Sequence, residues 1–228
     1  MTSSTDSTSL PSPTRRNRLW WSMQVLVQVF VSSWMGYRTR GLEHLPAQGG
    51  ALLLINHRSF LDPLLAGLPI HRPVSYVARH NLFSVPFLGP LLNRTYVIPI
   101  NRDAVGTATL REIVRRLDHG FLVGLFPEGT RHSGPESLGT LKPGFVSILR
   151  RANTPVIPIG IAGAERVLPR GAVFIRPKPI RVVFGKPIQR EQLEPLCERG
   201  REEDLLEFVR QQMSACVTEA QTWLSDRG

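Results

Sequence analysis

The chain has 228 residues, a hydrophobic fraction of 42% and a formal net charge of +10, from 28 Lys and Arg against 18 Asp and Glu. This length and apolar content predict one domain with a substantial core. The positive charge favours anionic partners such as phosphates, lipid headgroups or nucleic acid. Nucleic-acid binding usually shows a basic stripe interleaved with aromatic residues. We do not expect that partner here, because the basic residues are scattered and aromatic residues make up only 7%.

The N-terminal region divides into a polar tail and an uncharged stretch. Residues 1–13 are rich in Ser, Thr and Pro, the composition of a disordered segment. With the arginines that follow, they form a predicted disordered basic tail over residues 1–18. Residues 19–36 contain no charge. A membrane-spanning helix needs about 20 mostly apolar residues, whereas this stretch is slightly short and is interrupted by Ser22, Gln24, Gln28, Ser32 and Ser33.

Tryptophans near both ends of the uncharged stretch favour a helix that lies in the lipid headgroup layer. Trp20, Trp21 and Trp34 are amphipathic, and such residues concentrate at membrane interfaces. We therefore expect a membrane-associated helical segment over residues 19–40. An ordinary buried helix of this length is the alternative. A cleaved signal peptide is not favoured, because no small-residue cleavage site follows the stretch.

Over residues 41–228, short apolar runs alternate with helical patterns, which predicts an α/β fold with a mostly parallel or mixed sheet flanked by helices. Five runs have the length and composition of buried strands: residues 51–55, 74–78, 95–100, 121–126 and 155–161. Apolar residues at helical spacing from Leu110 to Phe121 predict a helix between two of these strands. Residues 172–175 and 180–184 lie on either side of RPKP and are expected to form one or two further strands, and residues 205–224 an amphipathic terminal helix.

The first polar cluster, residues 56–62 (NHRSFLD), directly follows the predicted strand 51–55, and sites in α/β sheets form at the ends of strands. His57 and Asp62 would point about 140° apart on a regular helix, so a hydrogen bond between them requires a turn. Pro63 disfavours helical geometry at Asp62 and suits the first position of a helix through residues 64–66. Asp62 is therefore a partner of His57, the N-cap of that helix, or both, since a carboxylate has two oxygens.

The second polar cluster, residues 126–131 (FPEGTR), also follows a predicted strand. Gly129 permits close backbone approach, Thr130 offers a hydroxyl, and Arg131 offers a fork of donors suited to a phosphate. The alternative is a polar turn in which Glu128 and Arg131 form an ion pair. Nearby, Lys142 adds a positive charge before a possible turn at residues 143–144, or is simply a solvated surface lysine.

The two clusters together resemble the glycerolipid acyltransferase family, especially bacterial 1-acyl-glycerol-3-phosphate acyltransferases. Their order and spacing are those of the family, and the resemblance covers residues 41–187. Residues 156–159 (VIPI) resemble the family's fourth, Pro-centred block. Arg102 occupies the arginine that ends its second block, where residues 99–102 (PINR) lack the acidic residue usual in the family. Arg79 lies in a family segment where lysine is common. These departures bear on acceptor choice more than on the reaction.

The resemblance implies an enzyme in which His57 is the catalytic base and Asp62 orients and stabilises its imidazole. The base would deprotonate the free hydroxyl of lysophosphatidic acid, which attacks the thioester of acyl-CoA or acyl-carrier protein and gives phosphatidic acid for phospholipid synthesis. No metal, other cofactor or covalent acyl-enzyme is expected. The resemblance also implies substrate-binding residues, with the last two assigned to the phosphates of the donor: Asn56, Arg102, Glu128, Gly129, Thr130, Arg131, Arg79 and Lys142.

Two alternatives remain open at this point. The same chemistry could act on another acceptor, such as glycerol-3-phosphate, a lysophospholipid with a larger headgroup, or a lyso-aminolipid. A non-catalytic protein that binds anionic membranes would explain the charge and the apolar stretch, but it has no use for His57 beside the second cluster. The cysteines are read as reduced bystanders, which favours a membrane-associated enzyme on the cytoplasmic face. An inert or structural role is expected for His71, His80, His119 and His132.

Overall fold

The computed structural model describes residues 12–13, 18–86, 89–90, 92, 96–100, 107–169, 171–172 and 174–226. Most of the predicted tail over residues 1–18 lies outside these residues. Arg102 lies outside them as well, and so do the side chains of Arg79, Trp20 and Trp21.

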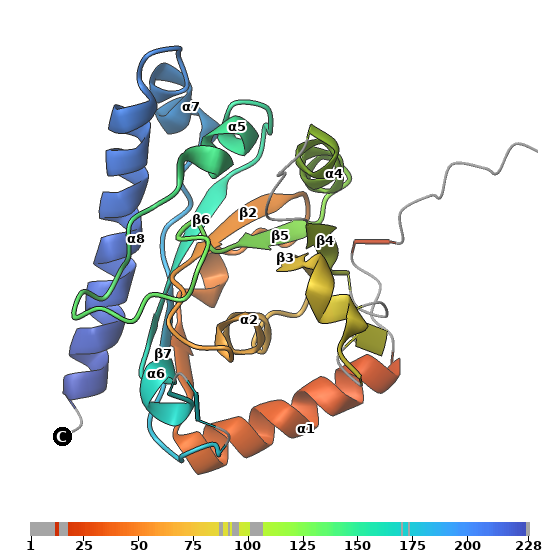
Figure 1. Cartoon of the computed structure of the whole chain (residues 1–228), viewed down its shortest axis with the longest axis vertical. Coiled ribbons are helices and arrows are strands. Elements are labelled where there is room, and N and C mark those ends of the chain that lie inside the picture. Colours follow the sequence, from red (N-terminus) through yellow and green to blue (C-terminus); the bar gives the residue numbers. More distant parts are fainter. Residues whose placement is uncertain are drawn as a thin grey trace, which may run out of the picture.

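A seven-stranded sheet forms the centre of the molecule (Figure 1). Its order is β1 (Arg38–Arg40), β7 (Arg181–Phe184), β6 (Val156–Ala162), β2 (Ala51–Ile55), β5 (Leu122–Leu125), β3 (Val74–Arg79) and β4 (Ile98–Ile100). Neighbouring strands are parallel except β6 and β7, which are antiparallel. The expected α/β fold with a mostly parallel sheet is therefore confirmed.

Helices cover both faces of the sheet, so that β2 and β6 are buried along their whole length. On one face, Leu53 and Ile55 of β2 pack in a core that includes α1 (Arg18–Met35), α2 (Asp62–Gly67) and α6 (Ala164–Val167). On the other face, Leu52 and Leu54 pack in a core formed with α4 (Thr107–Asp118), α5 (Val146–Leu149), α7 (Arg190–Leu193) and α8 (Glu202–Ser225). The alternation of side chains along β2 thus assigns each half of the molecule its own core.

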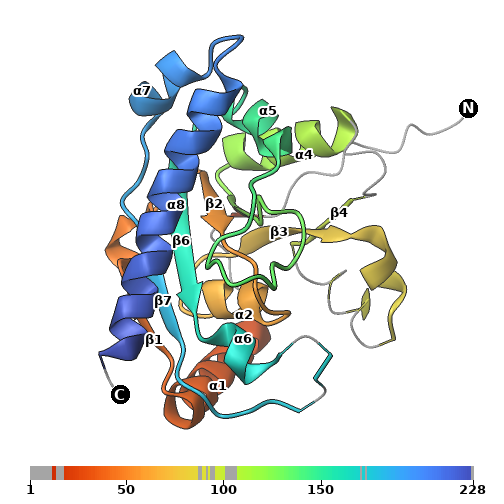
Figure 2. The same cartoon turned by 60° about the vertical axis from the view of Figure 1, so that its left-hand side comes forward.

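Short 3-10 helices and one long helix complete the chain. The former are η1 (Leu42–His44), η2 (His80–Ser84), η3 (Pro143–Phe145) and η4 (Glu194–Leu196). The helix α8 has 24 residues and lies along β6 and β7, with Leu205, Val209 and Met213 buried (Figure 2). Within the described ranges, no helix combines the length and the apolar character needed to cross a membrane.

Of the one or two strands expected from residues 172–175 and 180–184, only β7 forms, and one observed strand, β1, was not predicted. Ala172, Phe174 and Ile175 form no strand, and 83% of the Phe174 surface is exposed. The apolar run predicted a buried strand, but prolines at 177 and 179 follow it and lack the N–H groups that a ladder requires. Conversely, β1 is a three-residue strand of sequence RTR that pairs with β7. It has no apolar run by which it could be recognised.

Candidate active site

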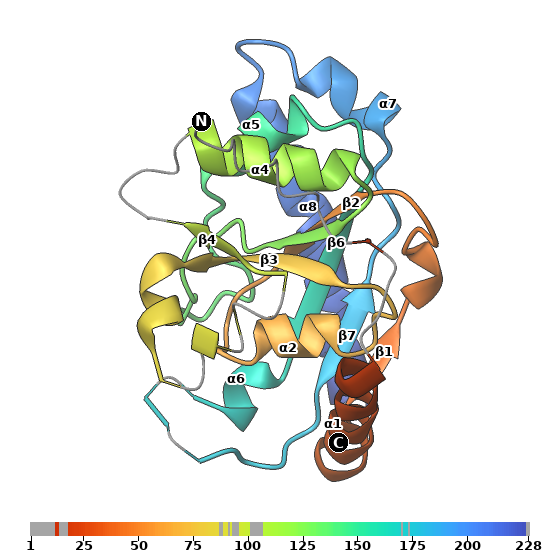
Figure 3. The ribbon, with the colours of Figure 1, turned by 90° about the vertical axis from the view of Figure 1, so that its right-hand side faces the viewer.

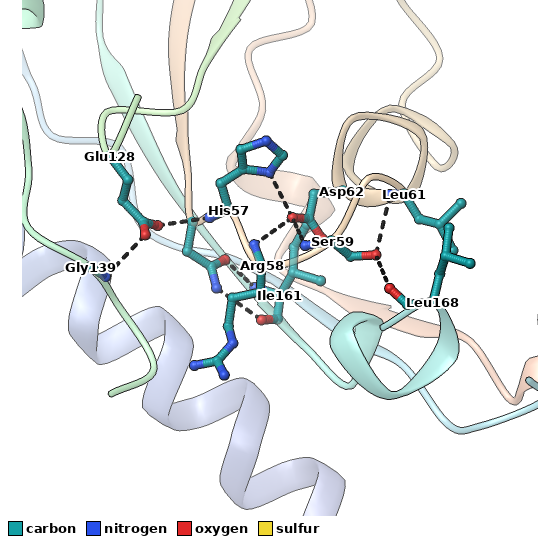
Figure 4. A network of polar contacts seen from close by, with 10 residues as sticks. His57, Arg58, Ser59, Leu61, Asp62, Glu128, Gly139, Ile161 and Leu168 are labelled. Carbon is teal, nitrogen blue, oxygen red and sulfur yellow. Dashed lines mark hydrogen bonds and ion pairs between the residues drawn. The ribbon is translucent and has the colours of Figure 1, made fainter. Parts of the chain in front are cut away.

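The two polar clusters meet because the strands before them are parallel neighbours. Residues 56–62 follow β2 and residues 126–131 follow β5, and these strands pair in register from Ala51 with Leu122 to Leu54 with Leu125. The carboxyl ends of parallel strands lie at the same edge of a sheet, which is where α/β proteins build sites. The loops are thereby brought into contact at His57 (Figure 4).

The imidazole of His57 is hydrogen-bonded to Asp62, and a turn between the two residues makes this bond possible. His57 Nδ1 lies 2.9 Å from Asp62 Oδ2, and the same oxygen accepts the backbone N–H groups of Arg58 and Ser59 at 2.7 Å each. Because Oδ2 also accepts two backbone N–H groups, we assign Nδ1 as the donor to it, and in that tautomer of the neutral imidazole Nε2 is the acceptor. The His57 side chain is 19% exposed and that of Asp62 1% exposed, so the acceptor nitrogen sits on a side chain that solvent reaches.

Burial and hydrogen bonding shift the pKa of Asp62 in opposite directions. Burial raises the pKa, and the hydrogen bonds from His57, Ser59 and Arg58 oppose that rise. All three bonds fall on Oδ2, while Oδ1 is buried and has no hydrogen-bond partner in the described part of the chain. The carboxylate is therefore held by one oxygen in a fixed orientation toward the imidazole.

The alternative in which Asp62 is the N-cap of α2 is wrong. The N-cap is Leu61, with no side-chain capping bond, and Asp62 is the first residue of the helix. Pro63 was expected to disfavour helical geometry at Asp62, but Asp62 is part of the helix. Pro63 is the second helical residue, and the N–H groups at the start of a helix have no intrahelical partner, so proline costs no hydrogen bond there. The carboxylate binds N–H groups that precede the helix, so it closes the turn that carries His57.

Glu128 holds the backbone of His57 from the other loop. Its Oε1 accepts the N–H of His57 at 2.7 Å, and its Oε2 accepts the N–H of Gly139 at 3.1 Å. The N–H of His132 in turn donates to the His57 carbonyl at 2.7 Å. Glu128 is 3% exposed, and burial raises its pKa against the lowering effect of these backbone bonds. Both backbone groups of His57 are thus fixed by the 126–132 loop.

The predicted pairing of Glu128 with Arg131 does not form among the described residues, whose ion pairs do not include it. Glu128 points inward, whereas Arg131 is exposed. The two residues follow each other through a turn that begins with the N–H of Gly129 donating to Phe126 and continues with Gly129 at φ 68°. A positive φ of this kind favours glycine, and it separates the inward carboxylate from the outward guanidinium.

Asn56 joins the first loop to β6. Its Nδ2 donates to the Ile161 carbonyl at 3.0 Å, and its Oδ1 accepts the Ile161 N–H at 2.8 Å. The side chain is 1% exposed. Asn56 and Glu128 were both predicted to bind substrate, but their side chains are buried and bonded to backbone. Their contacts support a positioning role instead.

The remaining predicted phosphate ligands within the described chain gather at one exposed edge. Gly129, Thr130, Arg131 and Lys142 are all exposed. The N–H of Lys142 donates to the Pro127 carbonyl at 2.8 Å, and a Cβ built on Gly129 would lie 3.5 Å from Lys142 Cγ. The lysine stem therefore lies beside the glycine turn. Exposure fits a solvated lysine and a phosphate ligand equally, so its role stays a prediction.

The site is completed by Phe126 and Arg58, which belong to the two polar clusters, and by Gly139 and Tyr76, which the sequence did not mark as neighbours of the site. The ring of Phe126 lies 4.2 Å from the His57 ring, centroid to centroid, and 6.3 Å from that of Tyr76. Arg58 donates to the Glu136 carbonyl and, at 3.3 Å, to the Gly134 carbonyl. These bonds hold the loop of residues 134–139 near Glu128. Phe126 lay inside a recognised cluster, whereas nothing in the pattern marked Gly139 or Tyr76 as neighbours of the site.

The described residues contain no group of three or more His, Cys, Asp or Glu placed to hold a metal ion. The polar side chains at this edge include the partly exposed imidazole of His57 and the exposed Thr130, Arg131 and Lys142. A base beside cationic donors is suited to deprotonating a hydroxyl on a molecule that also carries an anionic group.

Comparison with known proteins places the chain in a family. The acyltransferase family model matches residues 36–162, which include β2, both polar clusters and all of β6. The chain therefore belongs to the acyltransferase family, and the resemblance read from the two clusters is confirmed.

Individual relatives share a narrower name. The chain is 24% identical over 188 residues to the 1-acyl-sn-glycerol-3-phosphate acyltransferase of Bacillus subtilis, covering 82% of this chain and 91% of that protein. It is 29% identical over 177 residues to the chloroplastic enzyme BAT2 of Brassica napus, which bears the same name, but there it spans 75% of this chain and only 51% of the plant protein. The chain thus spans about half the length of that relative.

The fold also matches a solved structure. The crystal structure of the 1-acyl-sn-glycerophosphate acyltransferase PlsC from Thermotoga maritima superposes with a TM-score of 0.68, covering 90% of this chain and 84% of that chain at 20% identity. At that identity the likeness concerns the fold, and the chemistry of this chain is argued from its own residues.

Proposed function

We propose that this chain transfers an acyl group from acyl-CoA or acyl-carrier protein to the free hydroxyl of 1-acyl-glycerol-3-phosphate, giving phosphatidic acid. The observation that carries the proposal is the bond between His57 Nδ1 and Asp62 beside the exposed Thr130 and Arg131. The names of the relatives from Bacillus and Brassica support the choice of acceptor.

The geometry supports a direct transfer with His57 as base. Nε2 accepts the proton of the acceptor hydroxyl as that oxygen attacks the thioester carbonyl, and Asp62 stabilises the imidazolium that forms. Collapse of the tetrahedral adduct breaks the C–S bond, and the imidazolium returns its proton to the departing thiolate. The products are the ester and the free thiol, and His57 regains its starting state without a covalent intermediate.

The exposed donors would orient the acceptor. Arg131, with the Thr130 hydroxyl and the nearby Lys142, presents charge and hydrogen bonds to a phosphate. Holding the phosphate fixes the distance of the hydroxyl from Nε2, and such orientation contributes a large part of a rate enhancement. Asn56 and Glu128 act behind this surface as positioning residues, because they hold the backbone that carries the imidazole.

The test is His57→Ala in purified protein supplied with labelled acyl-CoA and lysophosphatidic acid. We expect the release of CoA and the labelled product to fall by roughly a hundredfold to ten thousandfold, the range that a general base contributes. His119→Ala, a change of the same side chain at an exposed position, is the matched control. Near-normal turnover in the His57 variant with an intact fold would overturn the mechanism.

The acceptor is tested separately from the base. A panel of lysophosphatidic acid, glycerol-3-phosphate, lysophospholipids with larger headgroups and a lyso-aminolipid should be assayed with one acyl-CoA and then with one acyl-carrier protein. We expect the highest kcat/KM with lysophosphatidic acid, because Arg131 and Lys142 present two positive charges to its phosphate. A higher value for an acceptor without a phosphate would leave the base chemistry intact and replace the acceptor.

We also propose that α1 lies in a membrane interface on the cytoplasmic side. One face of α1 packs on the protein through Val31 and Met35, and Gln24 Nε2 donates to the carbonyls of Leu68 and Ile70. The opposite face exposes apolar side chains at helical spacing, namely Val25, Leu26, Val29, Phe30 and Trp34. An amphipathic helix with an outward apolar face is suited to the headgroup layer.

Substitution tests this contact better than deletion, because deletion of α1 would also remove Val31 and Met35 from the core. The triple variant L26S/V29S/F30S should sediment with vesicles much less than wild type. The matched control is A215S/T218S/T222S on the exposed face of α8. Equal sedimentation of all three proteins would mean that α1 makes no membrane contact.

A further inference from the structure

Within the described ranges, the exposed large apolar side chains lie on a few elements and are absent from others. Among the described residues, the large hydrophobic side chains that are exposed belong to α1, to the region of α2, to the end of η2, and to the segment before β7. None lies on α4, α5, α7 or α8. Outside α1 they are Phe60, Leu64, Val85, Phe174 and Ile175.

The segment of residues 174–178 (FIRPK) stands out within this set. The Phe174 surface is 83% exposed, the largest value among the exposed apolar side chains, and Ile175 is 43% exposed. Arg176 and Lys178 follow directly and are exposed as well. Leaving an aromatic and a branched aliphatic side chain in water is unfavourable, because apolar surface is more stable when it is buried. Two cations beside them suit a bilayer surface, where anionic headgroups lie above an apolar layer.

The segment is anchored at its base and is therefore presented outward. The N–H of Arg176 donates to the Val167 carbonyl at 2.9 Å, and both Val167 and Ile180 are fully buried. A Cβ built on Gly163 would come 2.3 Å from the Pro179 carbonyl oxygen, so the chain passes close to α6 on its way to β7. Phe174 and Ile175 consequently project from a fixed base.

Contacts at that base join the segment to α1 and to the His57 loop. On one side, the N–H of Arg38 donates to the Ile180 carbonyl at 3.1 Å, and the Arg181 guanidinium donates to the Gly36 carbonyl at 2.7 Å, directly after α1. On the other side, the Ser59 hydroxyl donates to the Leu168 carbonyl at 3.4 Å. Figures 2 and 3 show α1 and the chain between α6 and β7 at the same end of the molecule, with α5 and α7 at the other.

We propose that residues 174–178 form a second membrane contact, in which Phe174 and Ile175 enter the headgroup layer and Arg176 and Lys178 bind anionic lipid headgroups. The inference rests on the proposed interfacial position of α1 and extends it. Two contacts at the same end of the molecule would fix the orientation of the protein, so that Phe60 of the His57 loop and Leu64 of α2 also face the lipid.

The first test separates apolar from charged contributions by vesicle sedimentation. F174S/I175S should weaken partitioning onto both neutral and anionic vesicles by at least about tenfold. R176Q/K178Q should weaken it only on vesicles containing phosphatidylglycerol, by roughly thirtyfold for the two charges. R151Q/R199Q removes the same charge at exposed positions near α5 and α7 and should leave partitioning unchanged.

The second test reports contact directly and does not depend on a loss of binding. An environment-sensitive fluorophore is attached to I175C in a C197S background and, as control, to S214C on the exposed face of α8. Anionic vesicles should shift the emission of the first label to the blue and leave the second unchanged. An unshifted label at 175 on vesicle-bound protein would overturn the proposal.

The outcomes distinguish this inference from the one on α1. If L26S/V29S/F30S releases the protein from vesicles while F174S/I175S and R176Q/K178Q bind as wild type, the 174–178 contact is wrong and the α1 contact stands. If a carrier protein without vesicles shifts the label at 175, the segment docks an acidic protein and the lipid assignment is overturned. Turnover of a short-chain, monomeric acceptor should be unchanged in both 174–178 variants, because these residues lie outside the catalytic machinery.

Discussion

The loop of residues 56–62 turns its polar groups inward, whereas the loop of residues 126–131 divides its polar groups between the interior and solvent. In the first, Asn56 and Asp62 are each 1% exposed and bonded to backbone or to the imidazole. In the second, Glu128 is the one polar side chain that is buried, and the three residues after it are exposed. One loop thus holds the His57 imidazole in a single geometry, while the other exposes Thr130 and Arg131 to solvent.

The largest effect on turnover is expected when the loop of residues 56–62 loses the carboxylate of Asp62. Asp62→Asn preserves the size of the side chain but removes the carboxylate that faces the imidazolium. Turnover should fall on the order of a thousandfold or more in single-turnover assays. Asp118→Asn, at an exposed position at the end of α4, should be indistinguishable from wild type. A loss below tenfold would mean that Asp62 serves the turn alone.

A change in the exposed part of the loop of residues 126–131 should instead alter the KM for the acceptor. Arg131→Ala removes charge-assisted hydrogen bonds worth about 1.5–3 kcal/mol, so the KM for the acceptor should rise roughly ten- to a hundredfold. Stability should change by less than about 0.5 kcal/mol, because the side chain is exposed. Slow hydrolysis of acyl-CoA in the absence of acceptor should be unchanged. An equal loss in hydrolysis would place Arg131 on the donor rather than the acceptor.

The junction between the loops can be disturbed without touching either polar cluster. A Cβ at Gly139 would lie 2.5 Å from Glu128 Oε2, so Gly139→Ala should displace the carboxylate and leave the His57 N–H unsatisfied. That loss is expected to cost about 1–3 kcal/mol in the free energy of unfolding, measured by denaturant titration. At Gly144 a Cβ would meet nothing within 4 Å, so Gly144→Ala is the matched control. Equal stability of the two variants would show that Glu128 is not confined.

The smallest effect concerns pH. Because burial raises the pKa of Glu128, the folded protein binds more protons at this site than the unfolded protein does. Its contribution to stability is full below the usual value of 4.5 and is lost as pH rises through the higher folded pKa. Wild type and Glu128→Gln should be compared by thermal unfolding across this pH window. The stability of wild type minus that of the variant should decrease as pH rises. A difference that increases would mean that the hydrogen bonds outweigh burial.

The predictions from sequence succeeded where residues close along the chain decide the structure. The strands at residues 51–55 and 155–161 followed from apolar runs, and the contact of His57 with Asp62 followed from the need for a turn near Pro63. Even there the detail differed, since α2 begins at Asp62.

Long-range partners explain what the sequence could not reveal. Asn56 pairs with Ile161 across 105 residues, and Glu128 pairs with the backbone of a glycine that has no side chain to mark it. The family resemblance implied that both bind substrate, because a polar residue in a motif looks the same whether it faces inward or outward. The apolar run at residues 172–175 misled for the opposite reason: Phe174 and Ile175 are exposed, and apolar character alone does not show whether a side chain is covered.

The paired bonds of Asn56 have a consequence for how the site can be altered. The side-chain amide presents a donor and an acceptor to Ile161 as a peptide group would, so it extends the ladder of β2 after the main chain has turned away. The position of the His57 imidazole therefore depends on β6, a strand from a later part of the chain. Aspartate lacks the donor and glutamine is one methylene too long. Grafting the 56–62 loop onto another scaffold would therefore require its neighbouring strand to be grafted with it.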